Sequence, residues 1–197
     1  MAGRLKDGLD MLAKAHIVEP FSPVAARFAN RFLWMNGNIE EAIAQAKTLR
    51  PGDRAANLAM IYASTGRFAE AADALAQSPN ANSSEISTAI HLLRNGPQGK
   101  PPIQNLSAYP QAIDFLYLAA GSPEPVLARV LDNLELRVAA GFIGGEIAFL
   151  WHPAYAPVRK TERFKSFLQQ AGYVEYWRAR GWPEFCHPTT GEDFACE

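Results

Sequence analysis

The sequence lacks an excess of basic residues. It contains 19 Lys and Arg residues against 20 Asp and Glu residues, which gives a formal net charge of −1. Proteins that bind nucleic acid need clustered cations to neutralise the phosphates, and no basic face can be read in this chain. We therefore expect no nucleic-acid partner.

Long apolar runs are also absent. The longest apolar stretch, Val138 to Trp151, is interrupted by Glu146 and three glycines, whereas a membrane-spanning helix needs about 20 apolar residues. The opening residues MAGRLKDGLDMLAKAH lack the apolar core and the small-residue cleavage site of a signal peptide. We expect no membrane insertion and a cytoplasmic protein, or a periplasmic one if the chain belongs to a longer membrane-anchored protein.

Catalytic motifs are missing as well. Neither G-x-S-x-G nor H-E-x-x-H occurs, and the four histidines have no companion acid at motif spacing. Gly141, Gly144 and Gly145 lack the lysine–serine ending of a phosphate-binding loop, so they favour a bend or close helix packing. The sequence predicts a protein that is not an enzyme and that uses no cofactor.

Cysteine is scarce, and its two copies leave three interpretations open. Cys186 and Cys196 lie ten residues apart, so a disulfide would close a short loop and add roughly 2–3 kcal/mol in an oxidising compartment. A zinc site would need four ligands. Cys186, His187, Cys196 and His152 supply the residue types without C-x-x-C spacing, so no metal is expected. Two free thiols are the third interpretation.

What the sequence does contain is a repeated helical pattern. Hydrophobic residues make up 48% and charged residues 20% of the 197 residues, as in ordinary globular proteins. Gly3 and Gly37 are 34 residues apart, with similar residues around them, and a third copy with Gly66 follows after 29. A period of about 34 is that of the tetratricopeptide repeat, a helix–turn–helix that buries its apolar stripe by stacking on its neighbours.

Apolar residues at three- and four-residue spacing, together with cap and turn residues, predict where the helices lie. Ser22-Pro23 is typical of a helix start, Asp53 is a candidate cap, and residues 97–110 form a proline-rich loop. The expected helices cover residues 1–15, 24–36, 39–49, 54–65, 68–77, 84–94, 111–120, 125–140, 161–171 and 175–180.

The pattern predicts an all-α fold in which residues 1–150 form a right-handed solenoid of helical hairpins. A concave groove lined by the first helices of the repeats, residues 24–36, 54–65 and 84–94, would bind a peptide or protein partner. The polar residues expected near this groove are Arg27, Asn30, Arg54, Asn57 and Tyr62.

The amino-terminal end of this solenoid has no leading helix. The first unit begins at the glycine of a repeat turn, which leaves Leu5, Leu9 and Leu12 without a partner on that side. Solenoid ends normally carry a polar cap. We therefore expect a carboxy-terminal piece of a longer protein, or self-association through this end.

Aromatic residues concentrate in residues 151–197, the predicted second domain. Short helices with large rings would cap the carboxy end of the solenoid, because each ring removes about 150–250 Å² from water. The alternative is a small-molecule sensor whose pocket lies between the last repeat and this tail. Its candidate residues are Arg159, Arg163, Tyr176, Trp177 and Arg178.

The tail also carries a family resemblance. The run LWHPAYAPVRKTERFKSFLQQAGYVEYWRARGWPEFCHP, residues 150–188, and the ending GEDFACE supply it. The matching elements include Arg159-Lys160, Arg163-Phe164, Tyr176-Trp177-Arg178, Gly181-Trp182-Pro183 and Phe185-Cys186. This segment resembles the carboxy-terminal region of bacterial tetratricopeptide proteins in which the repeats follow a winged-helix DNA-binding domain or a class III adenylate/guanylate cyclase domain.

The resemblance implies a sensory or scaffolding part of a bacterial signalling protein. The catalytic and DNA-reading domains of that group have no counterpart among residues 1–197, so neither activity is carried over. The expected function is a non-catalytic protein-interaction module.

Overall fold

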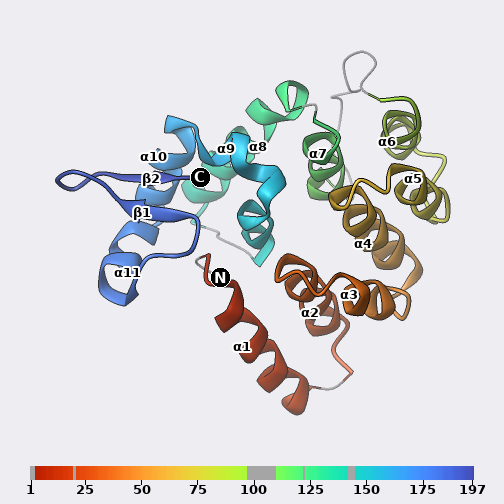
Figure 1. Ribbon diagram of the computed structural model, residues 1–197, viewed down its shortest axis with the longest axis horizontal. Coiled ribbons are helices and arrows are strands. Elements are labelled where there is room, and N and C mark those ends of the chain that lie inside the picture. Colours follow the sequence, from red (N-terminus) through yellow and green to blue (C-terminus); the bar gives the residue numbers. More distant parts are fainter. Residues whose placement is uncertain (1–2, 20, 97–109, 122, 142–144) are drawn as a thin grey trace. The chain divides into compact units, whose positions relative to one another are not determined.

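The computed structural model describes residues 3–19, 21–96, 110–121, 123–141 and 145–197. These residues are mostly helical and contain little strand, which confirms the all-α prediction (Figure 1). The α-helices are α1 (Leu5–Val18), α2 (Pro23–Met35), α3 (Ile39–Ala46), α4 (Pro51–Ser64), α5 (Phe68–Ala76), α6 (Ser84–Asn95), α7 (Pro110–Ala119), α8 (Glu124–Ala139), α9 (Ala156–Arg159), α10 (Glu162–Gln170) and α11 (Tyr173–Arg180). The 3-10 helices are η1 (Gly145–Trp151) and η2 (Pro153–Tyr155), and the strands are β1 (Cys186–Pro188) and β2 (Phe194–Cys196).

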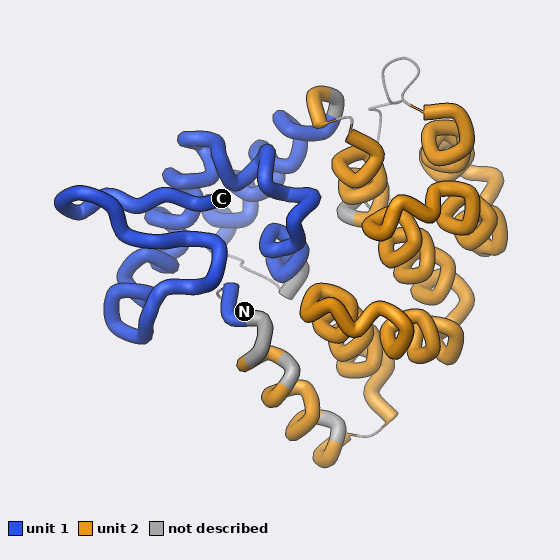
Figure 2. Tube along the Cα trace, viewed as in Figure 1, with its two compact units in different colours: residues 1–4, 126–197 blue, residues 5–125 orange. Residues whose placement is uncertain are grey.

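The chain divides into two compact units (Figure 2). Unit 2 comprises Leu5–Pro125, and unit 1 comprises Met1–Arg4 together with Val126–Glu197. The sequence predicts a boundary at residue 150, whereas in the structure most of α8 belongs to the same unit as the aromatic tail. The amino-terminal residues join unit 1 as well, since Arg4 Nη1 donates to the main-chain oxygen of Arg180 at 3.0 Å.

Side-chain caps fix several helix starts. The hydroxyl of Ser22 accepts a hydrogen bond from the N–H of Ala25, with Pro23 at the first helical position, as predicted. Ser83 and Thr161 cap α6 and α10 in the same way. The prediction for Asp53 is wrong: α4 begins three residues earlier because Pro51 takes the first helical position, and Asp53 lies in the first turn.

Two hairpins of unit 2 turn at glycines that the sequence pattern identified. Gly37 joins α2 to α3 at φ +85°, and Gly66 joins α4 to α5 at φ +76°. These left-handed conformations favour glycine, because a Cβ would clash with the main chain. The glycine spacing thus marks real helix–turn–helix units.

Small residues line the contacts between these helices. The alanines of α3, α4 and α5 that lie in the core have almost no exposed surface, which lets the helices approach closely. They are Ala42, Ala46, Ala55, Ala59, Ala63, Ala71 and Ala72. Helix α1 packs on α2 in a similar way, since a Cβ on Gly8 would overlap the ring of Phe32.

The order of helices in the third hairpin differs from the prediction. Helix α6, expected to lie beside the earlier first helices, packs on α5, and α7 packs on both α4 and α6 (Figure 1). Helix α7 is buried over nearly all of its described surface, including Phe115 and Leu116, so it takes the more enclosed position. The predicted connecting loop lies, at residues 97–109, outside the described residues.

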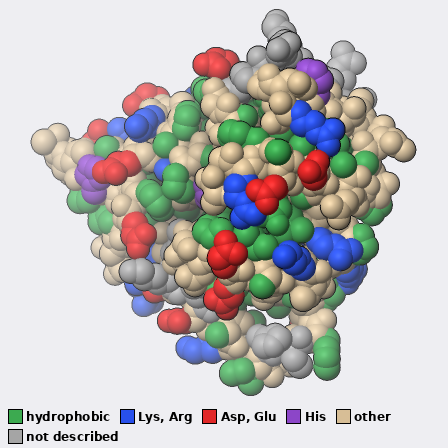
Figure 3. All heavy atoms as spheres, turned by 45° about the vertical axis from the view of Figure 1, so that its right-hand side comes forward, with side chains coloured by type: hydrophobic (Ala, Val, Ile, Leu, Met, Phe, Trp, Pro, Cys, Tyr) green, Lys and Arg blue, Asp and Glu red, His purple; other side chains and the backbone are tan. Residues whose placement is uncertain are grey.

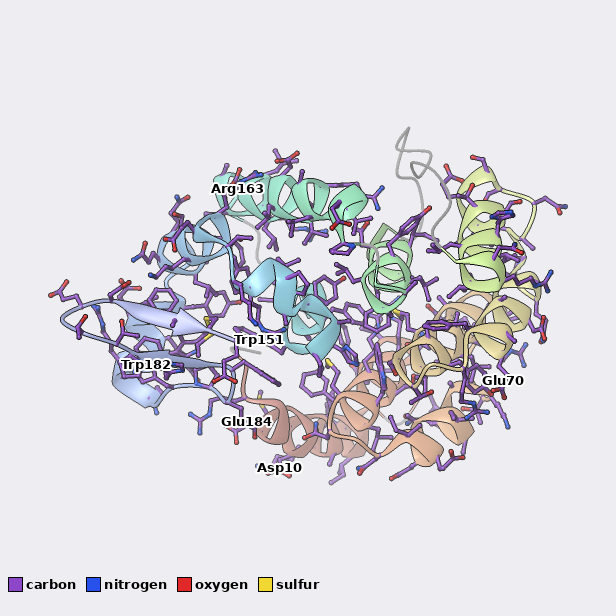
Figure 4. All side chains as sticks on the ribbon, turned by 45° about the horizontal axis from the view of Figure 1, so that its top comes forward. Asp10, Glu70, Trp151, Arg163, Trp182 and Glu184 are labelled. Carbon is purple, nitrogen blue, oxygen red and sulfur yellow. A yellow bond between two sulfur atoms is a disulfide. The ribbon has the colours of Figure 1, made fainter. Side chains whose placement is uncertain are left out.

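Unit 1 has an aromatic core. Trp151 from η1, Phe164 from α10, Trp177 from α11 and Phe194 from β2 are all buried. Trp177 lies at its centre, with ring centroids 5.8 Å from Trp151 and 5.5 Å from Trp182. Trp151 and Trp182 are labelled in Figure 4. The aromatic tail therefore packs into an ordered core within its own unit.

The sequence did not predict η1, η2, α9 or the β1–β2 hairpin. The strands pair antiparallel, with Cys186 opposite Cys196. Of the glycine-rich break predicted at residues 141–145, residues 142–144 lie outside the described residues. None of the helices in the described ranges has the length and apolar character that a bilayer crossing requires.

Candidate functional site

Two of the predicted groove residues are interior residues. Asn30 and Asn57 are each 1% exposed. The amide of Asn30 donates to the main-chain oxygen of Ala42 at 2.5 Å, and that of Asn57 to the oxygen of Asp53 at 2.7 Å. Both amide nitrogens are used inside the fold, so the prediction that these residues face a partner is corrected.

The other three groove residues are half-buried and engaged with neighbours. Arg27 forms an ion pair with Asp53 at 3.4 Å, and Arg54 donates to the oxygen of Lys47. Tyr62 lies under the guanidinium of Arg67, which is 4.4 Å from its ring centroid. These side chains lie at the surface of α2 and α4, but the structure does not bring all five predicted residues onto one face.

The predicted pocket residues of the tail do not assemble into one site either. Arg163 binds Asp132 and Glu135 of α8, while Arg178 donates to the main-chain oxygen of Glu192 (Figure 4). Tyr176 is 46% exposed, whereas Trp177 is fully buried in the aromatic core. Of the predicted set, Arg159 lines a cavity.

This cavity lies in unit 1, at the start of α10, and measures about 160 Å³. Its cationic lining consists of Arg159, Lys160 and Lys165, against one carboxylate, that of Glu162. The remaining lining residues are Thr161, Phe194, Ala195 and Cys196. The walls thus combine positive charge with one aromatic ring and the β2 strand.

Arg159 is only 4% exposed, and its guanidinium is fixed by three hydrogen bonds. Its Nε donates to the main-chain oxygen of Glu197 at 2.5 Å, and its Nη1 to the oxygens of Leu150 and His152 at 2.5 and 2.8 Å. The guanidinium also lies 4.8 Å from the centroid of the Phe185 ring. Burial lowers the pKa of Arg159 to about 10, while the charge of Glu197 opposes this shift.

The neighbouring His152 caps η2. Its Nδ1 accepts a hydrogen bond from the N–H of Ala154 at 3.1 Å. Burial, and then the charge of Arg159, lower its pKa to about 4. His152 is therefore neutral at neutral pH, and its Nδ1 is used in the cap.

The two cysteines are joined in a disulfide between β1 and β2. The bond removes both thiolates that a metal would require, and the described residues contain no cluster of histidine, cysteine and carboxylate side chains able to hold a metal. Of the three interpretations of Cys186 and Cys196, the structure has the disulfide. The disulfide links β1, which begins at Cys186, to β2. Strand β2 also carries Phe194, a residue of the aromatic core.

Replacing both Cys186 and Cys196 by alanine is expected to lower the free energy of unfolding by about 2–3 kcal/mol, because the unfolded chain regains the entropy that this loop closure removes. Chemical denaturation of the oxidised wild type and the double variant measures the difference. The variant in the presence of a dithiol reductant is the control, because it should not change further. Equal stability of the oxidised wild type and the variant would contradict the expectation.

Exposed apolar side chains form a separate feature along α1 and at the start of α2. Met11, Ile17, Val18, Phe21 and Val24 are 70, 81, 80, 94 and 53% exposed. We call these five residues the α1–α2 patch. In the described part of the chain, Leu136 and Tyr176 are the other large apolar side chains with such exposure, and both belong to unit 1.

Sequence reasoning pointed to the same end of the chain but to other residues. It selected Leu5, Leu9 and Leu12; Leu12 is half-buried, and the side chains of the other two lie outside those described. Met11, Ile17 and Val18 lie off the periodic stripe of α1, whereas Phe21 and Val24 lie beyond that helix. Their position off the periodic face is the signal that could have identified the three residues on α1. On the face shown in Figure 3, charges of both signs are intermixed, and neither gathers into a large field.

Comparison with known proteins does not add an assignment. No protein-family model, curated protein or solved structure matches this chain.

Proposed function

We propose that this chain is a non-catalytic protein-interaction module, built from tetratricopeptide-like hairpins in a right-handed stack and acting in a bacterial signalling protein. The glycine-turned hairpins support the repeat class, and the tail resemblance supports the signalling role. The single observation that carries an interaction function is the α1–α2 patch. Exposed apolar residues gathered in one place mark protein-binding surfaces more often than they mark ordinary surface.

The patch is large enough to contribute most of an interface. Its five side chains expose roughly 700 Å², taking about 150–250 Å² for a large ring and somewhat less for aliphatic residues. A standard interface buries about 800 Å² per partner. Flanking polar residues would supply the remainder, so no second surface is needed.

We assign a second copy of this chain as the occupant, because the charges around the patch are self-complementary. At 3.6 residues per turn, Met11, Lys14 and Val18 fall within an arc of about 60° on α1. A two-fold axis near residue 16 would pair antiparallel copies of α1. Met11 would then lie opposite Phe21 of the second copy, and Lys14 opposite Glu19 of the second copy, both of which are exposed.

Light scattering coupled to size-exclusion chromatography tests this assignment over a range of concentrations. The wild type should show the mass of a dimer. Ile17→Asp and Phe21→Asp should each raise the dissociation constant at least about tenfold, since the substitution enters the symmetric interface twice and leaves a buried charge unpaired.

Leu136→Asp is the matched control, because Leu136 is 69% exposed, lies in α8 of unit 1 and is not part of the patch. This variant should dimerise like the wild type. A wild type that stays monomeric at every concentration, or a Leu136→Asp variant that dissociates as readily as Phe21→Asp, would contradict the proposed dimer.

A small-molecule sensor is the second candidate function, and the cavity at Arg159 favours it. The cavity lies within unit 1 and shares only Arg159 with the predicted pocket.

A further inference from the structure

The end of strand β2 forms one wall of the cavity in unit 1. Ala195 and Cys196 line the cavity, and both are half-buried, whereas Phe194 before them is 1% exposed. The strand therefore has a buried start and a shallow end. Apolar burial holds Phe194 in the aromatic core, so residues 195–197 depend more on specific bonds.

The turn of the β1–β2 hairpin is held by polar contacts of its own. Asp193 forms an ion pair with Lys165 at 2.8 Å, and its main-chain oxygen accepts the N–H of Thr189 at 2.9 Å. These contacts do not involve residues 195–197. They can therefore persist when the end of the strand moves.

At the end opposite the turn, the disulfide is the covalent tie. Cys196 is bonded to Cys186, and the residue that follows makes two hydrogen bonds. The N–H of Glu197 donates to the main-chain oxygen of Phe185 at 2.9 Å, and the main-chain oxygen of Glu197 accepts from Arg159 Nε at 2.5 Å. Because hydrogen bonds add only modest net stability, the disulfide determines how often this strand end detaches.

A reductant can reach the disulfide from the Cys196 side. Cys196 is half-buried and lines the cavity, whereas Cys186 is 1% exposed. Thiol–disulfide exchange requires that a thiolate reach one of the two sulfurs. We therefore expect attack on Cys196, with the buried Cys186 as the leaving group.

We propose that the Cys186–Cys196 disulfide is a redox switch that controls this wall of the cavity. While the bond is intact, Glu197 stays hydrogen-bonded to Arg159. When a dithiol reduces the bond, residues 195–197 detach far more often, and the cavity opens on the β2 side. Phe194 and the turn stay in place. The switch does not depend on the proposed dimer, because the α1–α2 patch lies in unit 2.

The reaction transfers two electrons from the dithiol to the two cysteines. The first thiolate of the dithiol attacks the Cys196 sulfur, the S–S bond breaks, and Cys186 leaves as a thiolate. The second thiolate of the dithiol then attacks the mixed disulfide, forms a cyclic disulfide and releases Cys196. Both cysteines take up protons at neutral pH, because an ordinary cysteine thiol has a pKa near 8.5.

The test is hydrogen exchange of the full chain, oxidised and after treatment with a dithiol, followed by nuclear magnetic resonance. Exchange of the Glu197 amide and of the Arg159 Nε–H should accelerate about 30- to 150-fold on reduction, the factor expected when a disulfide with a sequence separation of 10 is lost. The Thr189 amide at the turn is the internal control, and its rate should change less than about twofold.

The double variant Cys186→Ala with Cys196→Ala is the matched control. Its Glu197 amide should exchange like that of the reduced wild type, and addition of the dithiol should not change the rate. A dithiol effect of the same size in this variant would overturn the proposal, because the effect would not come from the disulfide.

Three results in the wild type would also overturn the proposal. The folded protein treated with the dithiol could yield no free thiols, which would show that the bond is inaccessible. Equal protection of the Glu197 amide before and after reduction would show that other bonds hold the strand end. Equal acceleration at Glu197 and Thr189 would show that the whole hairpin is released.

Discussion

Replacing Trp177 by alanine is expected to lower the free energy of unfolding of unit 1 by about 3–5 kcal/mol. Trp177 is fully buried, and its ring contacts those of Trp151, Tyr173, Trp182 and Phe194. Truncation would leave a cavity at the centre of the aromatic core, and the rings around it also lose pair energies of about 0.5–1.5 kcal/mol each. Denaturant unfolding followed by near-ultraviolet circular dichroism measures the change.

The adjacent residue provides a matched control. Tyr176 lies on the same helix but is 46% exposed, so Tyr176→Ala should change stability by no more than about 0.5 kcal/mol. Comparable losses in the two variants would show that the aromatic tail is held by its helices and not by a ring core.

In unit 2, Trp34→Ala should cost about 3–5 kcal/mol because Trp34 links three helices. It is 2% exposed on α2, its Nε1 donates to the hydroxyl of Ser64 on α4 at 2.9 Å, and its ring lies 4.9 Å from that of Phe115 on α7. Loss of the ring would weaken the α2–α4–α7 layer. Far-ultraviolet circular dichroism during denaturation measures the effect.

A graded pair of variants separates the contributions. Trp34→Phe keeps a ring but loses the hydrogen bond, so it should cost about 1–2 kcal/mol. Phe21→Ala, which removes an almost fully exposed ring of the same unit, should be within about 0.5 kcal/mol of the wild type. If Trp34→Ala unfolds like Phe21→Ala, α7 does not pack on α2 and α4 as described.

The sequence predicted the helices because the interactions that start and end a helix involve residues close together in the chain. Ser22 and Ser83 hydrogen-bond to N–H groups three residues away, and Gly37 and Gly66 adopt the left-handed conformation within their own turns. Such interactions involve neighbours in the chain, so the pattern of caps, glycines and apolar spacing located the helices to within a few residues.

The arrangement of the third hairpin could not be predicted in the same way. Helix α6 was expected beside α4, but α7 packs on α4 instead. The ring contact that ties α7 to α2 joins Trp34 and Phe115, which are 81 positions apart in the sequence. The β1–β2 hairpin was also missed, because strands of three residues carry too few side chains for a two-residue period to appear.

The surroundings of the candidate site residues could not be predicted from the sequence either, because they depend on residues distant in the chain. Asn30 and Asn57 were expected at the surface because amides are usually exposed, but each finds a main-chain acceptor inside the fold. Arg159 was one of several tail arginines, and its burial depends on acceptors contributed by residues 150, 152 and 197. The Cys186–Cys196 pairing was one of three open interpretations, and the strand register that places these residues opposite each other was not visible in the sequence.

The interaction function is tested most directly by exchanging the charges that flank the α1–α2 patch, with sedimentation equilibrium as the measurement. Lys14→Glu should weaken the dimer, because it places two acidic residues opposite each other, and Lys14→Glu combined with Glu19→Lys should restore it. Restoration requires that the partner carry both substitutions, as only a second copy does. A double variant that stays as dissociated as Lys14→Glu, or a single variant that dimerises like the wild type, would contradict the account.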